Sequence, residues 1–71
     1  MSKSALKSSL HGKLKAGDEV KIDGNTFTVK RAKYGYRGWQ WLIEGDKLSI
    51  NAVSRFRGER EIFDYTTEAV N

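Results

Sequence analysis

The feature that most constrains this chain is an alternation of apolar and polar residues, punctuated by glycines, that begins after Gly17. Successive side chains of a β-strand point to opposite faces of its sheet, so a period of two predicts strands that bury one face. The glycines supply turns, and the chain contains no proline, a residue that central strands exclude. The pattern therefore predicts a mainly β domain made of antiparallel hairpins.

The first predicted hairpin turns at Gly24-Asn25, a dipeptide typical of tight two-residue turns. Centring the turn there places four apolar side chains on one face in two opposed pairs, Ile22 with Phe27 and Val20 with Val29. The alternation fails near Arg31, because strict pairing would point Arg31 and Lys33 inward. We therefore predict a bulge or sharp bend there, which turns Ala32 and Tyr34 towards the core.

The second predicted hairpin follows a turn over residues 35–38. Residues 39–44 form its first strand, and the apolar side chains on the buried face are Trp39, Trp41 and Ile43. A turn at Gly45-Asp46 gives the expected cross-strand pairs Ile43 with Leu48, Trp41 with Ile50 and Glu44 with Lys47. The core predicted from both hairpins comprises Val20, Ile22, Phe27, Val29, Trp41, Ile43, Leu48 and Ile50.

The remaining pattern is less regular. Residues 51–57 form a fourth strand or a short turn, and a further turn over residues 58–60 leads back along it. The expected pairs across this last turn are Phe56 with Ile62 and Val53 with Tyr65. Five short strands with tight glycine turns predict a small five-stranded antiparallel barrel.

Two segments resemble known small barrels. The run LKAGDEVKI at residues 14–22, followed by Gly24 and by FTV at residues 27–29, resembles the opening of SH3-like barrels of the KOW and Tudor type. The run LSINAVSRF at residues 48–56 resembles the last turn of Sm-like barrels, which also begin with a short helix. The resemblance implies an SH3-like fold over residues 14–65, and it carries over no functional residue.

The chain is long enough for one domain only. We assign residues 1–13 to a basic N-terminal helix or tail, residues 14–66 to the barrel and residues 67–71 to a C-terminal tail. In the helix, Ser4 is the cap, Leu6 and Leu10 share one face, and Gly12 is the stop. Two turns of helix are not stable alone, so a frayed basic tail is an equal alternative.

The composition excludes several kinds of site. Without cysteine, the chain has no thiolate metal ligand and no cysteine nucleophile. Its one histidine, His11, has no carboxylate close in sequence with which to bind a metal. The glycines are spread among turns instead of gathered in a phosphate-binding loop. We therefore predict no metal, no cofactor and no enzymatic activity.

The chain also lacks the marks of membrane insertion or export. No stretch approaches the ~20 apolar residues of a membrane span. The N-terminus lacks the apolar run that a secretory signal needs. The sequence predicts a cytoplasmic protein that makes no contact with a membrane.

The charges are segregated along the chain. Thirteen Lys and Arg against nine Asp and Glu give a net charge of +4. Residues 1–15 and 30–37 hold cations and no acid, whereas the acids gather at residues 18–23, at residues 44–46 and from Glu59 onward. This distribution favours one basic face over a uniformly mixed surface.

The densest candidate site is the segment of residues 30–41, in which cations alternate with large aromatic side chains. Cations neutralise phosphates, and aromatic rings stack on unpaired bases of any identity. The candidate residues in this segment are Lys30, Arg31, Lys33, Tyr34, Tyr36, Arg37 and Trp39. The alternative is a charged cover over a core, because Trp41 must be buried in so small a barrel and lysines protect strand edges.

Arg55 and Arg57 extend the candidate set, because arginine suits bidentate contact with phosphate. Glu59 and Glu61 lie close by in sequence, so local ion pairs are the alternative interpretation. Binding by these arginines is favoured only if the fold brings them beside residues 30–37, which the sequence does not decide.

Together these features predict a non-catalytic nucleic-acid-binding β-barrel that tolerates many sequences, with single strands or RNA favoured by the aromatic residues. The alternative is a protein-interaction module, such as a small inhibitor or adaptor of a larger protein machine, since Tyr, Trp and Arg also dominate protein interfaces. A homo-oligomer joined through edge strands is compatible with either function.

Overall fold

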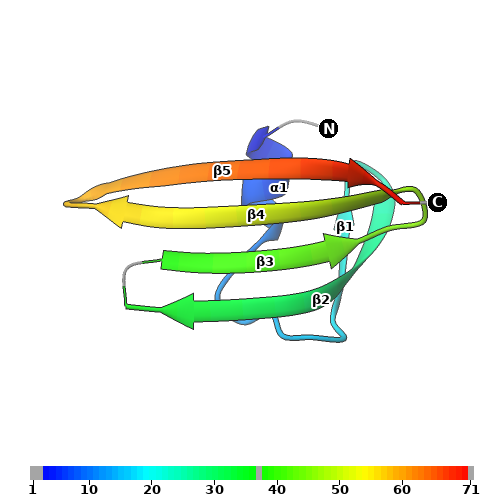
Figure 1. The fold of residues 1–71 in the computed structure, drawn as a ribbon, viewed down its shortest axis with the longest axis horizontal. Helices are drawn as coiled ribbons and strands as arrows, with labels where there is room; N and C mark the ends of the chain where they lie inside the picture. Colours follow the sequence, from blue (N-terminus) through cyan, green and yellow to red (C-terminus); the bar gives the residue numbers. More distant parts are fainter. Residues whose placement is uncertain (1–2, 37, 71) are drawn as a thin grey trace.

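The chain forms one antiparallel sheet and one short helix in a computed structural model that describes residues 3–36 and 38–70 (Figure 1). The elements in chain order are α1 (Lys3–Ser9), β1 (Glu19–Ile22), β2 (Asn25–Gly35), β3 (Gly38–Glu44), β4 (Leu48–Arg57) and β5 (Arg60–Ala69). The sheet has five strands in the order β1-β2-β3-β4-β5. The mainly β architecture is confirmed. Closure into a barrel is not confirmed, because β1 and β5 lie at opposite edges and no ladder joins them in the described ranges.

A bulge in β2 shapes the sheet. The register with β3 shifts between Val29 and Arg31, so Lys30 is the extra residue. Bulges bend the strand that carries them. In Figure 1, β2 curves out of the plane of the other strands, and β1 lies behind them together with α1. The predicted bulge near Arg31 is confirmed, and it explains how a single open sheet folds over its own core.

The core lies on the inner face of the sheet, which we define as the face that α1 covers. Leu6 of α1 is completely buried there, so the helical alternative for the N-terminal segment is correct and the tail is not. The buried apolar residues are Leu6, Leu10, Leu14, Val20, Ile22, Phe27, Val29, Trp41, Ile43, Ile50, Ala52 and Phe63. Every residue predicted for the core is among them except Leu48, which is half-buried and packs against the cluster.

The first hairpin turns one residue earlier than predicted. Val20 pairs with Phe27 and Ile22 with Asn25, so the turn is Asp23-Gly24, with φ of 50° and 81°. A two-residue turn that matches the sheet twist needs positive φ at both positions, and Asp-Gly meets this need. Moving a turn by one residue slides the strands by two, which keeps each side chain on its face. The predicted pairs were therefore wrong, whereas the predicted faces are confirmed.

The second hairpin turns one residue later than predicted, at Asp46-Lys47. Its pairs are Ile43 with Ile50, Trp41 with Ala52 and Glu44 with Ser49, in place of the expected ones. Gly45 flanks this turn and donates a backbone hydrogen bond to the Leu48 carbonyl oxygen at 2.8 Å, and a Cβ at this position would lie 2.9 Å from the Phe27 ring. The glycine is needed for close packing of the strand against Phe27. As in the first hairpin, the error is a slide of two residues and the faces are preserved.

In the third hairpin the cross-strand pairs are displaced by one residue from the predicted pairs. A displacement of one residue moves the side chains of the partner strand to the other face. Phe56 pairs with Glu61 and Val53 with Asp64, because the turn is Gly58-Glu59, with Gly58 at φ 66°. Turns with glycine at the first central position form tight hairpins of this kind. Phe56 therefore points to the inner face, and Ile62, its predicted partner, lies on the outer face at 36% exposure.

β5 is also longer than the pattern indicated. It pairs with β4 as far as Ala69, which lies opposite Leu48, so residues 67–69 belong to the strand and not to a tail. Both faces of this end of β5 are exposed. A strand without a buried face shows no alternation, so its length could not be predicted from the pattern.

Candidate nucleic-acid interface

The β2–β3 and β4–β5 hairpin tips lie at the same end of the sheet (Figure 1). Gly35 pairs with Gly38 at the first tip, and Gly38 also pairs with Arg55 of β4. Tyr36 lines a common cleft with residues 56–58. The fold therefore brings the two candidate basic segments together, which was the condition for binding by the arginines.

The strands separate most cations from most aromatics. Arg31 and Lys33 alternate with residues that turn inward, so they point to the outer face, opposite to α1. Arg55 and Arg57 also point outward. Ser54, the residue before Arg55, is buried on the inner side, and successive side chains of a strand point to opposite faces. The side chains of Tyr34, Trp39 and Phe56 lie on the inner face. Along the described strands the cations and rings therefore point mainly to opposite faces, and the tips bring both kinds close together.

The outer face has a shallow depression at the first tip. Lys33 and Arg55 border it, together with Gln40 and Val53, and its floor contains Gly35 and Gly38. The β3 and β4 backbones approach so closely here that a Cβ on Gly38 would lie 2.4 Å from the Ser54 carbonyl oxygen. No side chain can therefore replace this glycine without displacing backbone. The depression is open to a ligand between two cations.

The outer-face cations have no carboxylate partners in the part of the chain that the structure describes. The ion pairs found there are Lys3 with Asp64 and Lys7 with Glu61, and neither involves an arginine. Glu61, which we considered as a partner of the nearby arginines, points inward and accepts a hydrogen bond from Ser54 Oγ at 2.8 Å. The positive charge of Arg31, Lys33, Arg55 and Arg57 is therefore not neutralised by ion pairs among the described residues.

Two of the candidate aromatics have structural roles. The Tyr34 hydroxyl accepts a hydrogen bond from Trp41 Nε1 at 3.0 Å and lies 2.9 Å and 2.8 Å from the His11 and Leu14 carbonyl oxygens. It thus ties the segment after α1 to the sheet. Trp39 packs edge-to-face against Tyr34 and Trp41, with ring centroids 6.4 Å and 6.1 Å away. Both rings therefore support the fold, although Tyr34 is also 40% exposed and both residues line the depression.

Tyr36 and Phe56 are the exposed aromatics of the tips, at 95% and 40% exposure. Phe56 was not among the candidate residues from the sequence, where it was only expected to pair with Ile62 across the last turn. Only the turn residue that follows it, Gly58, could have indicated the correct register. Lys30 lies away from the tips, in a cleft with Glu44 and Asp46. The remaining candidate, Arg37, lies outside the described residues.

The pKa of Glu61 is lowered, first by the hydrogen bond from Lys7, then by the hydrogen bond from Ser54. A carboxyl whose pKa is lower in the folded state stabilises the fold above its unfolded-state pKa, and this contribution disappears as the pH falls through the folded-state pKa. We therefore expect the free energy of unfolding of the unmodified protein to decline as the pH falls from the unfolded-state pKa of Glu61 through its folded-state pKa. Part of this loss is the contact between Lys7 of α1 and Glu61. Urea unfolding at a series of pH values measures this dependence.

Glu61→Gln is the matched variant for this experiment, because glutamine keeps the size and the acceptor for Ser54 but does not titrate. It should be less stable than the parent at neutral pH and should show a weaker dependence on pH in the acidic range. Parallel stability curves for the two proteins would contradict the proposed role of Glu61.

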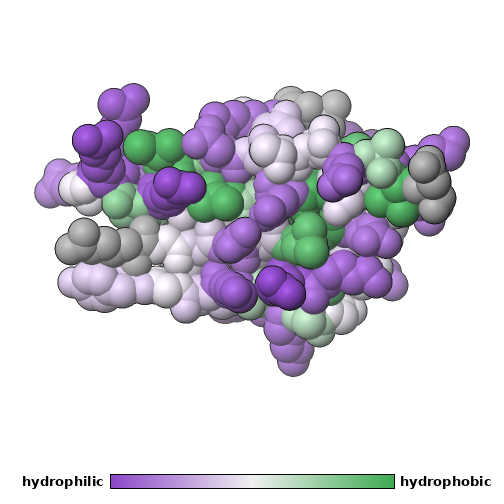
Figure 2. All heavy atoms as spheres, in the orientation of Figure 1, coloured by the Kyte–Doolittle hydropathy of each residue, from purple (hydrophilic) through white to green (hydrophobic). Residues whose placement is uncertain are grey.

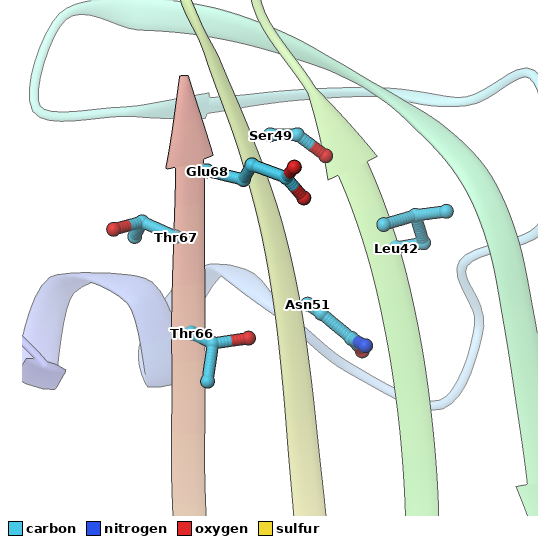
Figure 3. Close-up of a pocket in the computed structure, with 6 residues that line it drawn as sticks. All are labelled: Leu42, Ser49, Asn51, Thr66, Thr67 and Glu68. Atoms are coloured by element: carbon cyan, nitrogen blue, oxygen red, sulfur yellow. The ribbon is translucent and has the colours of Figure 1, made fainter. Parts of the chain in front are cut away.

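A pocket on the outer face, towards the end of the sheet opposite the hairpin tips, is of a different kind. Its volume is about 330 Å³, and side chains of β3, β4 and β5 line it (Figure 3). Its lining residues are Leu42, Ser49, Asn51, Thr66, Thr67 and Glu68. The charged member is a carboxylate, which repels phosphate. This pocket therefore does not extend the basic surface.

Residues 3–36 and 38–70 lack two other kinds of feature. No helix has the length and apolar character needed to cross a membrane. No cluster of three or more His, Asp or Glu side chains is arranged to hold a metal ion. The site is thus defined by cations, glycines and aromatic rings. No known protein family matches the chain, and no curated protein or solved structure is significantly similar to it.

Proposed function

We propose that this protein is a non-catalytic nucleic-acid-binding domain that recognises the phosphate backbone with little dependence on sequence. The observation that carries the proposal is the depression between Lys33 and Arg55, two outer-face cations without carboxylate partners among the described residues. Gly35 and Gly38, which carry no side chain, also line this depression. Cations so placed bind phosphates and release counterions, which favours association.

The other outer-face cations extend this surface in two directions. Arg31 lies on β2, two residues before Lys33 and on the same face, and Arg57 lies on β4, two residues beyond Arg55. Figure 2 shows that the outer face is mainly hydrophilic, with hydrophobic side chains in separate patches. Such a surface suits a wet, charged interface better than the apolar core of a stable protein interface.

A protein partner is the second candidate, favoured by a different observation. Phe56 and Ile62 are both large and exposed, on opposite faces of the β4–β5 hairpin. Exposed aromatic and aliphatic side chains beside arginines are typical of interface hot spots. Binding of this kind would depend weakly on salt, whereas binding to phosphates depends on it strongly, so a salt titration separates the two functions.

If Arg31, Lys33, Arg55 and Arg57 each contact a phosphate, the logarithm of the association constant should fall against the logarithm of salt concentration with a slope of roughly −3 to −4. Lys33→Gln and Arg55→Gln should each reduce the magnitude of this slope by about one unit, while the melting temperature stays close to that of the parent. Fluorescence anisotropy of labelled oligonucleotides over a range of salt concentrations measures the slope.

Lys47→Gln is the matched control, because Lys47 lies in the β3–β4 turn at the other end of the sheet. It removes the same charge and should leave the slope unchanged. A slope near zero for the parent would reject the proposal and favour the protein partner. Equal effects of all three variants would show that net charge, and not this surface, determines binding.

A further inference from the structure

We infer that the two hairpin tips form a binding site for one unpaired nucleobase, so that the preferred ligand is a single strand and not a duplex. The inference rests on the proposed function and narrows it to one class of nucleic acid. It starts from the cleft that Tyr36 of one hairpin shares with Phe56, Arg57 and Gly58 of the other.

The chemistry of the cleft suits a base with its phosphate. Two aromatic residues and one arginine line a space of about 570 Å³, within the ~300–1,000 Å³ typical of small-molecule sites. Aromatic rings stack on any base, because every base has a π-face. The guanidinium of Arg57 can stack on the base or bind the adjoining phosphate in a bidentate manner. The contacts discriminate poorly between bases, in agreement with sequence-tolerant binding.

The Phe56 side of the cleft is supported from the core. The Phe56 ring packs edge-to-face against Trp39, with centroids 5.6 Å apart and an interplanar angle of 82°. Trp39 in turn contacts Trp41, which is 2% exposed. A row of rings thus runs from the core to the tip and holds Phe56 in position. A ring that is already ordered loses little conformational entropy when a ligand stacks on it.

The position of the cleft gives the strand a path. Lys33 and Arg55 lie on the outer face, and Arg57 continues this row to the tip. A backbone held by these cations on the outer face would reach the tip, where a base could turn around the end of the sheet towards Tyr36 and the inward-facing Phe56. A base can follow this path only if it is unpaired, because pairing and stacking hold the bases of a duplex inside the helix.

Binding of an oligonucleotide that carries one 2-aminopurine tests the inference, because the fluorescence of this base responds to stacking. Single-stranded and duplex forms of the same oligonucleotide are titrated with the protein. We expect a fluorescence change with the single strand, and tighter binding of the single strand than of the duplex.

Tyr36→Ala should weaken single-strand binding roughly 5- to 150-fold, the range for the loss of one stacked base. It should leave duplex binding and the melting temperature nearly unchanged, since the Tyr36 side chain is 95% exposed. Tyr36→Phe keeps the ring and should bind like the parent. Phe56→Leu keeps an apolar side chain but removes the other ring, and it should also reduce the fluorescence change.

Ile62→Ala is the matched control, since Ile62 is similarly exposed on the same hairpin but is not part of the cleft. It should retain both the fluorescence change and the preference for the single strand. Salt-dependent binding with no fluorescence change, or an unaltered preference in Tyr36→Ala, would overturn the inference and leave the proposed function intact. Failure of both oligonucleotide forms to bind would overturn both.

Discussion

Trp41→Ala is expected to lower the free energy of unfolding by about 3–5 kcal/mol, the range for removing a large buried aromatic side chain. The indole is 2% exposed, contacts the rings of Tyr34 and Trp39, and donates a hydrogen bond to the Tyr34 hydroxyl. Alanine would leave a cavity and also release the tether between Tyr34 and the segment after α1. Domains of this size have little stability in reserve, so most of it should be lost.

Urea unfolding followed by circular dichroism measures this loss. Tyr36→Ala is the matched control, because it also removes an aromatic side chain but at a position that is 95% exposed. A change within about 0.5 kcal/mol is expected there. If Trp41→Ala unfolded at the same urea concentration as the control, Trp41 could not be the centre of the core.

Leu6→Ala should lower the free energy of unfolding by about 2–5 kcal/mol, although Leu6 belongs to a helix of only seven residues. Its side chain is completely buried in the cluster on the inner face. Since the sheet does not close, this helix covers apolar surface that the strands leave open. The expected cost is therefore that of a core residue and not that of a terminal tail.

Ser8→Ala is the control on the same helix. Ser8 is exposed, and its hydroxyl donates to the Ala5 carbonyl oxygen within the helix. This change should alter stability by less than about 0.5 kcal/mol. Equal unfolding midpoints for Leu6→Ala and Ser8→Ala would mean that α1 does not contribute to the core in solution.

The periodic pattern correctly predicted which side chains of the first three strands face the core. The errors in the turn positions displaced the cross-strand pairs by two residues, an even number. A turn placed one residue away at Asp23-Gly24 or Asp46-Lys47 slides the partner strand by two residues, which conserves the buried side. At Gly58-Glu59 the observed pairs differ from the predicted pairs by one residue, an odd number. The predicted partner therefore lies on the opposite face of the sheet. The predicted pair of Phe56 with Ile62 was therefore wrong, since the two side chains lie on opposite faces of the hairpin.

Other features depend on contacts that pattern alone does not contain. Gly45 has a packing role, which becomes visible only when the ring of Phe27 lies against it. The two hairpin tips lie side by side because β3 pairs with β4, with Gly38 opposite Arg55. The cations and rings of residues 30–41 are dense in the sequence, but the strands divide most of them between two faces. Their division between two faces follows from the strand period itself.

The attachment of α1 to β5 has a consequence for solubility. Lys7 contacts Glu61 on the inner side of the edge strand, whereas Lys3 lies 3.8 Å from Asp64, which points to the outer side. Helix α1 therefore contacts side chains on both faces of β5, an edge strand to which another polypeptide could add by β-pairing. Fraying of α1 would uncover this edge strand and the apolar inner face in a single event. We therefore expect that removal of α1 would raise the tendency of the chain to self-associate through β5.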